Sequence, residues 1–201
     1  MVSEAPTGRP LDRDFFARPV GRVARDLVGC AFSVDGVGGI IVEVERYQDD
    51  DPASHSFRGP TQRTAPMFGP PGGLYVYRSY GVHWCVNLVA EDEGRGAAVL
   101  VRAIEPRWGL DLMRRRRGCE DPAELCSGPG KLTQALGIDG SLSGASAVAG
   151  GSVRVARPEG PAPSVVSGPR VGISKAVDRP WRHGVAGSPF VSRPRIDRRA
   201  A

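Results

Sequence analysis

Lysine is almost absent from this 201-residue sequence, and its basic character comes almost wholly from arginine. Only Lys131 and Lys175 are lysines among the 27 basic residues, which face 22 acidic ones. Few positions could therefore supply a nucleophilic amine for covalent catalysis. The formal net charge of +5 and the arginine bias favour a polyanionic partner, because the guanidinium fork matches the geometry of a phosphate.

Cysteines and long apolar runs are also scarce. The four cysteines form no C-x-x-C pair. Cys119, Cys126 and a histidine could in principle bind zinc, but their spacing does not match that of any usual zinc finger. We therefore expect no bound metal and a reducing, cytoplasmic location, associated with the nucleoid if the source is bacterial. No run of 18 apolar residues occurs and the first ten residues resemble no signal peptide, so we expect no membrane span and no export.

The length and the 40% share of hydrophobic residues suit one domain with a substantial core. We predict a disordered lead over residues 1–10, a single domain over residues 11–192 and a basic tail over residues 193–201. Residues 48–73 are rich in Asp, Pro, Gly, Ser and Arg, which predicts a long irregular loop of the kind that often carries function.

Strand and helix patterns lie on both sides of this loop. The turn signal Asp35-Gly36 predicts two paired strands within residues 31–47. Further strands are expected at 74–78, 82–90, 97–104 and 152–156, with short ones within 171–192. Helices are expected to begin near Asp12 or Asp14, at Pro19, at Pro106 and at Lys131. This pattern predicts a mixed α+β fold with a central antiparallel sheet.

Three of the four tyrosines, Tyr75, Tyr77 and Tyr80, fall within six residues. Tyr75 and Tyr77 share one face of a strand because side chains alternate, and they could be ordinary aromatics of the core or the sheet face. Tyr80 differs, since an aromatic residue in a tight turn beside Gly81 has little core to enter. Its position suggests a wedge for insertion or a contact with a partner.

Alternation also places Glu43, Glu45 and Tyr47 on one strand face, while Ile40, Val42 and Val44 take the other. Such a face could simply be solvated. If the strands pair in order, however, it lies next to the tyrosines and to His55 in the long loop. A carboxylate, an imidazole and aromatic rings in one pocket suit acid/base chemistry on a stacked ring.

Alternation places His83, Cys85 and Asn87 on one face of a later strand, and Leu100, Arg102 and Ile104 on one face of the next. Arg102 needs a partner among apolar neighbours. It could pair with a glutamate of the earlier strand as a structural contact, or it could meet a phosphate and position a catalytic water.

Two arginine- or glycine-rich segments carry weaker signals. The run Arg114 to Arg117 suits a solvated helix face that adds non-specific attraction to nucleic acid. The segment Ser127 to Lys131 is similar to a phosphate-binding loop but lacks the required spacing, and Leu132 stands where a Ser or Thr is needed.

Several segments together resemble the alkyladenine (3-methyladenine) DNA glycosylase family in order and spacing. They are I-V-E-V-E-R-Y (41–47), S-H-S (54–56), M-F-G-P-P-G-G-L-Y-V-Y-R-S-Y-G-V-H-W-C-V-N (67–87), V-L-V-R-A-I-E-P (99–106) and L-C-S-G-P-G-K-L (125–132). The likeness runs from about Leu11 to Ser192, so that residues 11–192 would form the glycosylase domain. It implies a single-domain mixed fold with a curved antiparallel sheet flanked by short helices, and no cofactor.

The resemblance implies a role for each matching residue. Glu45 is similar to the general base that activates water, Arg102 to the residue near the phosphate and that water, and Val171 to the residue whose carbonyl helps to hold the water. Where the family commonly has Glu-Ala-Tyr, this chain has Arg46, which should point to the opposite strand face.

The base-binding roles are implied in the same way. Tyr47 and Tyr77 match the aromatic walls that sandwich the flipped base, and His55 matches the contact at its edge. Asn87 matches the residue that crowds the exocyclic amine of guanine, and Tyr80 the intercalating wedge.

The expected activity is that of a monomeric, monofunctional DNA glycosylase in base excision repair, acting on double-stranded DNA that contains an alkylated or deaminated purine. Because neither lysine lies in the tyrosine and carboxylate region, we expect no Schiff-base lyase step. One rival is a non-catalytic module that senses distorted duplex, against which the presence of Glu45 argues. Another is a formyltransferase-like or RNA-acting domain, for which no formyl-donor motif is present.

Overall fold

The structure, a computed structural model, describes residues 8–148, 150–157 and 160–196. Most of the predicted lead, residues 1–7, lies outside the described residues, as do residues 197–201 of the predicted tail. Residues 9–10 of the lead form a short strand paired with Ala156 and Arg157, so the ordered domain begins earlier than predicted. The start of the predicted tail also touches the domain, since the Pro194 carbonyl accepts a hydrogen bond from Arg182.

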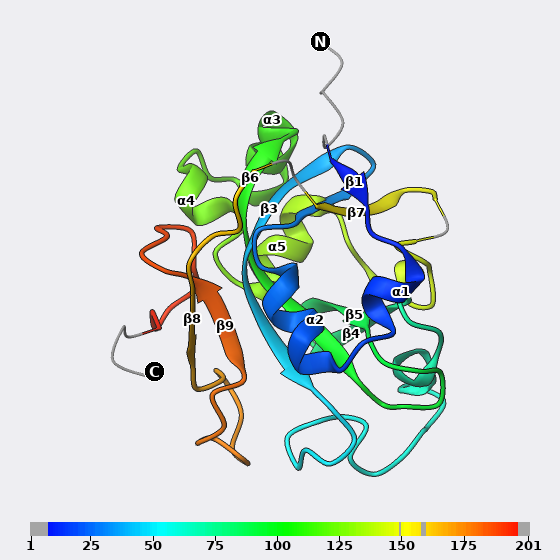
Figure 1. The fold of residues 1–201 in the computed structure, drawn as a ribbon. Helices are drawn as coiled ribbons and strands as arrows, with labels where there is room; N and C mark the ends of the chain where they lie inside the picture. The colour runs from blue at the N-terminus through cyan, green and yellow to red at the C-terminus, as the bar shows by residue number, and fades with distance from the viewer. Residues whose placement is uncertain (1–7, 149, 158–159, 197–201) are drawn as a thin grey trace.

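One curled antiparallel sheet runs through the molecule in the order β1-β7-β2-β3-β6-β5-β4 (Figure 1). Strand β3 is its axis, because β6 pairs along one edge while β2 and then β9 pair along the other, and β8 pairs with β9. The strands are β1 (Arg9–Pro10), β2 (Ala31–Val34), β3 (Val37–Tyr47), β4 (Leu74–Ser79), β5 (His83–Val89), β6 (Ala98–Trp108), β7 (Val153–Arg157), β8 (Val165–Gly168) and β9 (Arg182–Val185).

Short helices cover the sheet, with α2 packed on β3 and β6 and α5 packed on β5, β6 and α3. Asp12 caps α1 by accepting a hydrogen bond from the Phe15 N–H, as the sequence predicted, and Gly137 ends α5 in the left-handed conformation. The helices are α1 (Arg13–Phe16), α2 (Val20–Leu27), α3 (Leu110–Arg117), α4 (Pro122–Leu125) and α5 (Pro129–Leu136), with 3-10 turns η1 (Ala65–Phe68) and η2 (Gly140–Leu142). None of the described helices is long and apolar enough to cross a membrane.

The alternation of side chains along β4, β5 and β6 divides the sheet into two faces. Leu74, Val76, Val86 and Val99 enter the main core beneath the helices. The intervening residues, including Tyr75, face the other way, where a small cluster of buried side chains lies beside a cavity. The predicted α+β fold with a curved antiparallel sheet and flanking short helices is therefore confirmed.

Irregularities in β3 and β6 correct two details of the predicted pattern. The pairing of these strands shifts register around Glu43, so Val42 and Val44 lie in different hydrophobic clusters rather than on one face. Beyond the shift Ile104 joins the main core and does not share the cavity face with Arg102. The side chains of Glu43 and Glu45 nevertheless both form an ion pair with Arg102.

Pro106 does not begin a helix, because β6 continues through it to Trp108 and α3 begins at Leu110. Proline is tolerated there because it faces Gly39 beside a second register shift, where the ladder is irregular. A side chain at Gly39 would collide with the Glu105 carbonyl, so the glycine permits this close approach. Helix α4 and strand β8 were also not predicted, and the single strand β9 stands where several short strands were expected.

Candidate active site

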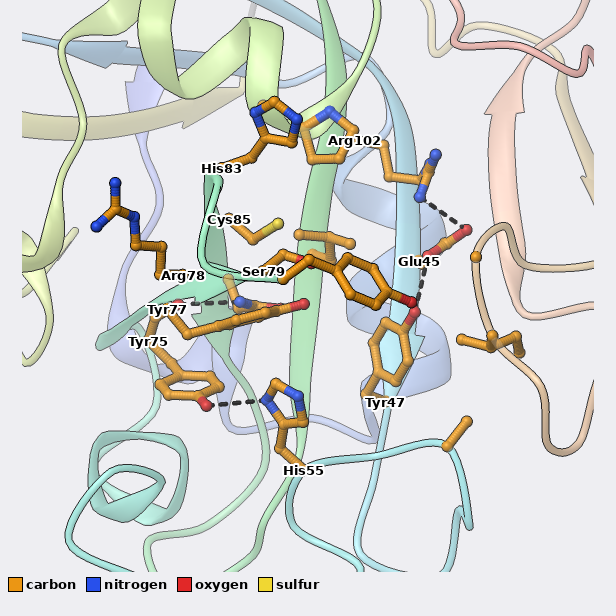
Figure 2. Close-up of a pocket in the computed structure, with 18 of the residues that line it drawn as sticks. Glu45, Tyr47, His55, Tyr75, Tyr77, Arg78, Ser79, His83, Cys85 and Arg102 are labelled. Carbon is orange, nitrogen blue, oxygen red and sulfur yellow. Dashed lines mark hydrogen bonds and ion pairs between the residues drawn. The ribbon is translucent and has the colours of Figure 1, made fainter.

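A cavity of about 480 Å³ opens on the sheet face that carries Tyr75 and Tyr77, and the first residues of α5, Pro129 and Gly130, also line it (Figure 2). This volume falls within the range of small-ligand sites. The structure brings all eight predicted site residues to its lining, namely Glu45, Tyr47, His55, Tyr77, Tyr80, Asn87, Arg102 and Val171. Arg46 is not among the lining residues and instead stacks on Trp181, with 4.0 Å between its guanidinium carbon and the ring centroid.

Glu45 is fully buried at the cavity and is held by three groups. Its Oε1 accepts a hydrogen bond of 2.8 Å from the Val171 backbone N–H and lies 3.2 Å from Arg102 Nη1. Its Oε2 accepts a hydrogen bond of 2.8 Å from the Tyr47 hydroxyl. A carboxylate with this many donors is fixed in one orientation, and the ionised form is the one that accepts such bonds.

Arg102 is buried between two carboxylates, because its Nε also lies 3.1 Å from Glu43 Oε1. Burial alone would lower the pKa of the guanidinium, but attraction from Glu45 and Glu43 outweighs it and raises the pKa above its ordinary value. Glu43 in turn pairs with Arg182 and accepts hydrogen bonds from Ser192. The sequence left two roles open for Arg102, a pairing with a glutamate or a contact with a phosphate and a catalytic water. The structure contains the pairing with glutamate.

Aromatic rings from two strands and the long loop gather beside this carboxylate (Figure 2). The rings of Tyr75 and Tyr77 stack with centroids 5.4 Å apart, and His55 meets the Tyr77 ring edge-on at 4.5 Å. Burial, followed by the charge of Glu45, raises the pKa of Tyr47, and burial also raises the pKa of Tyr77. Both phenols therefore remain protonated donors near neutral pH.

His55 is oriented by the long loop and by the tyrosine strand. Its Nδ1 lies 2.9 Å from the Tyr75 hydroxyl, which leaves Nε2 for a ligand. Burial and the nearby Arg63 guanidinium lower the pKa of the imidazole, so it is neutral at physiological pH.

Asn87 and Tyr80 line the same cavity, but one is buried and the other is exposed. Asn87 is buried, and its Nδ2 donates a hydrogen bond of 2.9 Å to the Tyr75 carbonyl, which fixes its position. Tyr80 lies at the tip of the β4–β5 hairpin, 89% exposed, with a φ of 49°. The predicted hairpin tip is confirmed, and its ring packs on no core.

Sequence reasoning missed several residues at or beside the cavity. Arg63 lines it from the long loop, with its guanidinium carbon 5.9 Å from the Tyr77 centroid, and nothing local marked it among 25 arginines. Gly130 also lines it, and a Cβ there would lie 2.8 Å from the His83 ring. Gly130, the second glycine of the segment Ser127 to Lys131, thus allows α5 to pack closely on β5.

The described residues contain no group of three or more His, Cys, Asp or Glu side chains that could hold a metal ion. Neither lysine is among the residues that line the cavity. Lys131 pairs with Glu124, and Lys175 lines a neighbouring cavity that shares His55 and Arg63 with the first.

Residues 14–189 match the sequence profile of a family described as methylpurine-DNA glycosylase. Several similar proteins carry the name "Putative 3-methyladenine DNA glycosylase". One from Rhodopseudomonas palustris (strain BisB18) is 57% identical over 187 residues, which cover 93% of this chain and 92% of that protein. The one from Nitrosospira multiformis is 58% identical over 90% of this chain and 92% of its own length. The one from Nitrobacter winogradskyi is 56% identical over 96% of this chain and 94% of its own length.

Proposed function

Because the chain belongs to the methylpurine-DNA glycosylase family, we propose that it is a monofunctional DNA glycosylase that flips an alkylated or deaminated purine out of duplex DNA and hydrolyses its N-glycosidic bond. The observation that carries the proposal is the Glu45 carboxylate, buried at a cavity lined with aromatic rings and bound to the hydroxyl of one of them. The proposal gives the chain a place in base excision repair.

A base inside duplex DNA hides its glycosidic bond, so the nucleotide must be extruded at a cost of a few kcal/mol. In the proposed complex, stacking of the base against Tyr47 and Tyr77 recovers about 1 to 3 kcal/mol. A purine with a positive charge gains further attraction to the ring faces. The free nitrogen of neutral His55 is available for the edge of the nucleotide.

The proposed chemistry breaks the bond between the sugar C1′ and the purine nitrogen, and the bonding electrons leave with the base. An alkylated purine cation departs as a neutral base, whereas an uncharged deaminated purine must also take up a proton from solvent as it leaves. The sugar becomes oxocarbenium-like, and the ionised Glu45 stabilises this charge. A water adds to C1′ and passes a proton to Glu45. The Val171 N–H, Arg102 and the Tyr47 hydroxyl keep the carboxylate oriented for both tasks.

One chain supplies every group in this proposal, which supports action as a monomer on double-stranded DNA. The absence of lysine from the lining supports hydrolysis by water over a Schiff-base lyase step. Buried Asn87, with its amide nitrogen held by Tyr75, suits a fixed steric barrier to the exocyclic amine of guanine.

The test is excision from a duplex with one lesion, read by alkali cleavage of the abasic product, in the parent and in Glu45→Gln. The variant keeps the shape but loses the base, so lesion binding should stay within about threefold while excision falls by at least about 10²-fold. Glu105→Gln is the matched control, since Glu105 pairs with Arg107 away from the cavity. More than a few per cent of parent activity in Glu45→Gln would exclude Glu45 as the base.

A further inference from the structure

Another buried ion pair lies beside the cavity and has no part in the chemistry above. The side chains of Asp51 and Arg170 are both fully buried. Arg170 Nη2 donates a hydrogen bond of 3.0 Å to Asp51 Oδ1, and Nη1 donates to Oδ2, so the pair is bidentate. Compared with apolar residues of similar volume, a buried pair of this kind contributes little net stability, so its contacts with neighbouring segments are its main consequence.

The arginine end of the pair holds the strand that carries Glu45 and Tyr47. The guanidinium carbon lies 4.7 Å from the Tyr47 ring centroid, and Nη1 donates a hydrogen bond of 3.2 Å to the carbonyl of Arg46, the residue between them. Arg170 thus contacts the Tyr47 ring, one proposed wall of the base pocket, and also the carbonyl of the residue that precedes it.

The same residue is next in sequence to the group that holds the carboxylate. Val171 donates its backbone N–H to Glu45 Oε1. Since Arg170 is anchored by its side chain, the peptide that follows it is anchored as well.

The carboxylate end of the pair organises the loop that leads to His55. Asp51 Oδ1 accepts a hydrogen bond of 3.1 Å from the Ala53 N–H, and the Asp51 carbonyl accepts one of 2.8 Å from the Ser54 N–H. Ala53 and His55 both line the cavity. One ion pair therefore joins the segment of Arg170 and Val171 to the end of β3 and to the start of the long loop, which lie 119 or more positions earlier in the sequence.

We propose that Arg170, held by Asp51, is a positioning residue for excision: it sets the orientation of the Tyr47 wall and of the Val171 N–H on Glu45. This role rests on the proposed function. Arg179 is not expected to share this role. It stacks on the same Trp181 as Arg170, but it is one-third exposed and lies no closer than 3.9 Å to Asp51. Arg179 thus offers a matched control.

The test compares Arg170→Lys with Arg179→Lys, because lysine keeps the charge but loses the planar fork and the flat cationic face. Single-turnover excision should slow at least about tenfold in Arg170→Lys and stay within about twofold in Arg179→Lys. Affinity for undamaged duplex should match the parent in both. The melting temperature should fall in Arg170→Lys, because a fully buried bidentate pair loses a donor, and should stay near that of the parent in Arg179→Lys. Methylguanidinium should restore part of the excision rate to Arg170→Ala, whereas sodium chloride at the same ionic strength should not.

A second measurement needs no excision. In the inactive Glu45→Gln background, Arg170→Lys should lower the ratio of lesion affinity to undamaged-duplex affinity several-fold, because the Tyr47 wall is less well placed. A parent that excises no damaged purine would refute the proposed function. An active parent matched within twofold by Arg170→Lys would overturn the positioning role. So would an equal loss of excision and of undamaged-duplex affinity, which would show a purely structural pair.

Discussion

Replacement of Tyr80 by glycine should move stability and excision in opposite directions. Tyr80 has a φ of 49°, which costs an L-residue roughly 1 to 2 kcal/mol, and its 89% exposed ring gains little from the rest of the protein. Glycine adopts this conformation freely but loses about 0.4 to 1 kcal/mol through the greater entropy of the unfolded chain. The free energy of unfolding should therefore be unchanged or up to about 1.6 kcal/mol higher in Tyr80→Gly.

Excision should fall if the ring fills the hole that a flipped nucleotide leaves in the stack. The lost stacking of about 1 to 3 kcal/mol lowers the flipping equilibrium by the same amount. Since each 1.4 kcal/mol is a factor of ten, single-turnover excision of a paired lesion should slow by roughly tenfold to a hundredfold. Tyr80→Ala should show this loss as well, and Tyr80→Phe, which keeps the ring, should stay near the parent.

The assay is single-turnover kinetics on a lesion that is paired, mismatched or in a single strand, at two salt concentrations. The loss of excision rate should be smaller on the mismatched and single-stranded lesions, because extrusion of the base costs less free energy there. The salt dependence of excision should match that of the parent, because no phosphate contact is removed. An equal loss on paired and unpaired substrates would refute the wedge and show that Tyr80 supports the pocket itself. A clear drop in the free energy of unfolding would refute the argument from backbone strain.

Three further outcomes are expected. Asn87→Ala should increase removal of guanine-derived bases, including some undamaged guanine, and an unchanged ratio of guanine to adenine lesions removed would contradict this. Borohydride should trap no covalent adduct during turnover, and a band that disappears in Lys175→Arg would reveal a lyase step through the neighbouring cavity. Burial, with Arg25 and Arg46 nearby, lowers the pKa of His183 from 6.5 to about 4, so the unfolded chain binds a proton first as the pH falls. The parent should lose about 2 kcal/mol of unfolding free energy from this group between pH 7 and pH 5 in urea titrations. His183→Asn should not, and equal losses would show that another group titrates.

Residues close in sequence were the predictable part of the candidate site. Glu45 and Tyr47 share a strand face by simple alternation, and the tip position of Tyr80 follows from Gly81. The partners of these residues were harder to find, because Asp51 and Arg170 are separated by 119 positions and no local pattern links them. Arg63 and Arg182 were missed for the same reason, since an arginine in an arginine-rich chain carries no signal of its own.

The errors in the fold have a common physical origin in irregular backbone. Period-two reasoning placed Val42 with Val44, but the register shift at Glu43 turns one residue to the other face. A helix was predicted from Pro106 because proline suits a first helical turn, whereas a disturbed ladder opposite Gly39 accepts proline in a strand. Strand β8 was hidden in a Gly-, Ala-, Ser- and Pro-rich segment, because its four residues form a strand only by pairing with β9.

The two proposed walls of the base pocket depend on the fold to different degrees. Tyr47 and Glu45 are two residues apart on β3 and hydrogen-bonded to each other, so their relative position survives distortion elsewhere. Tyr77 lies on β4, three strand spacings from β3 in the order β3-β6-β5-β4, or about 14 Å across a flat sheet. Only the curl of the sheet brings it near Tyr47. The spacing of the walls is therefore a property of the whole packed sheet, whereas the geometry between base and carboxylate is a property of one strand.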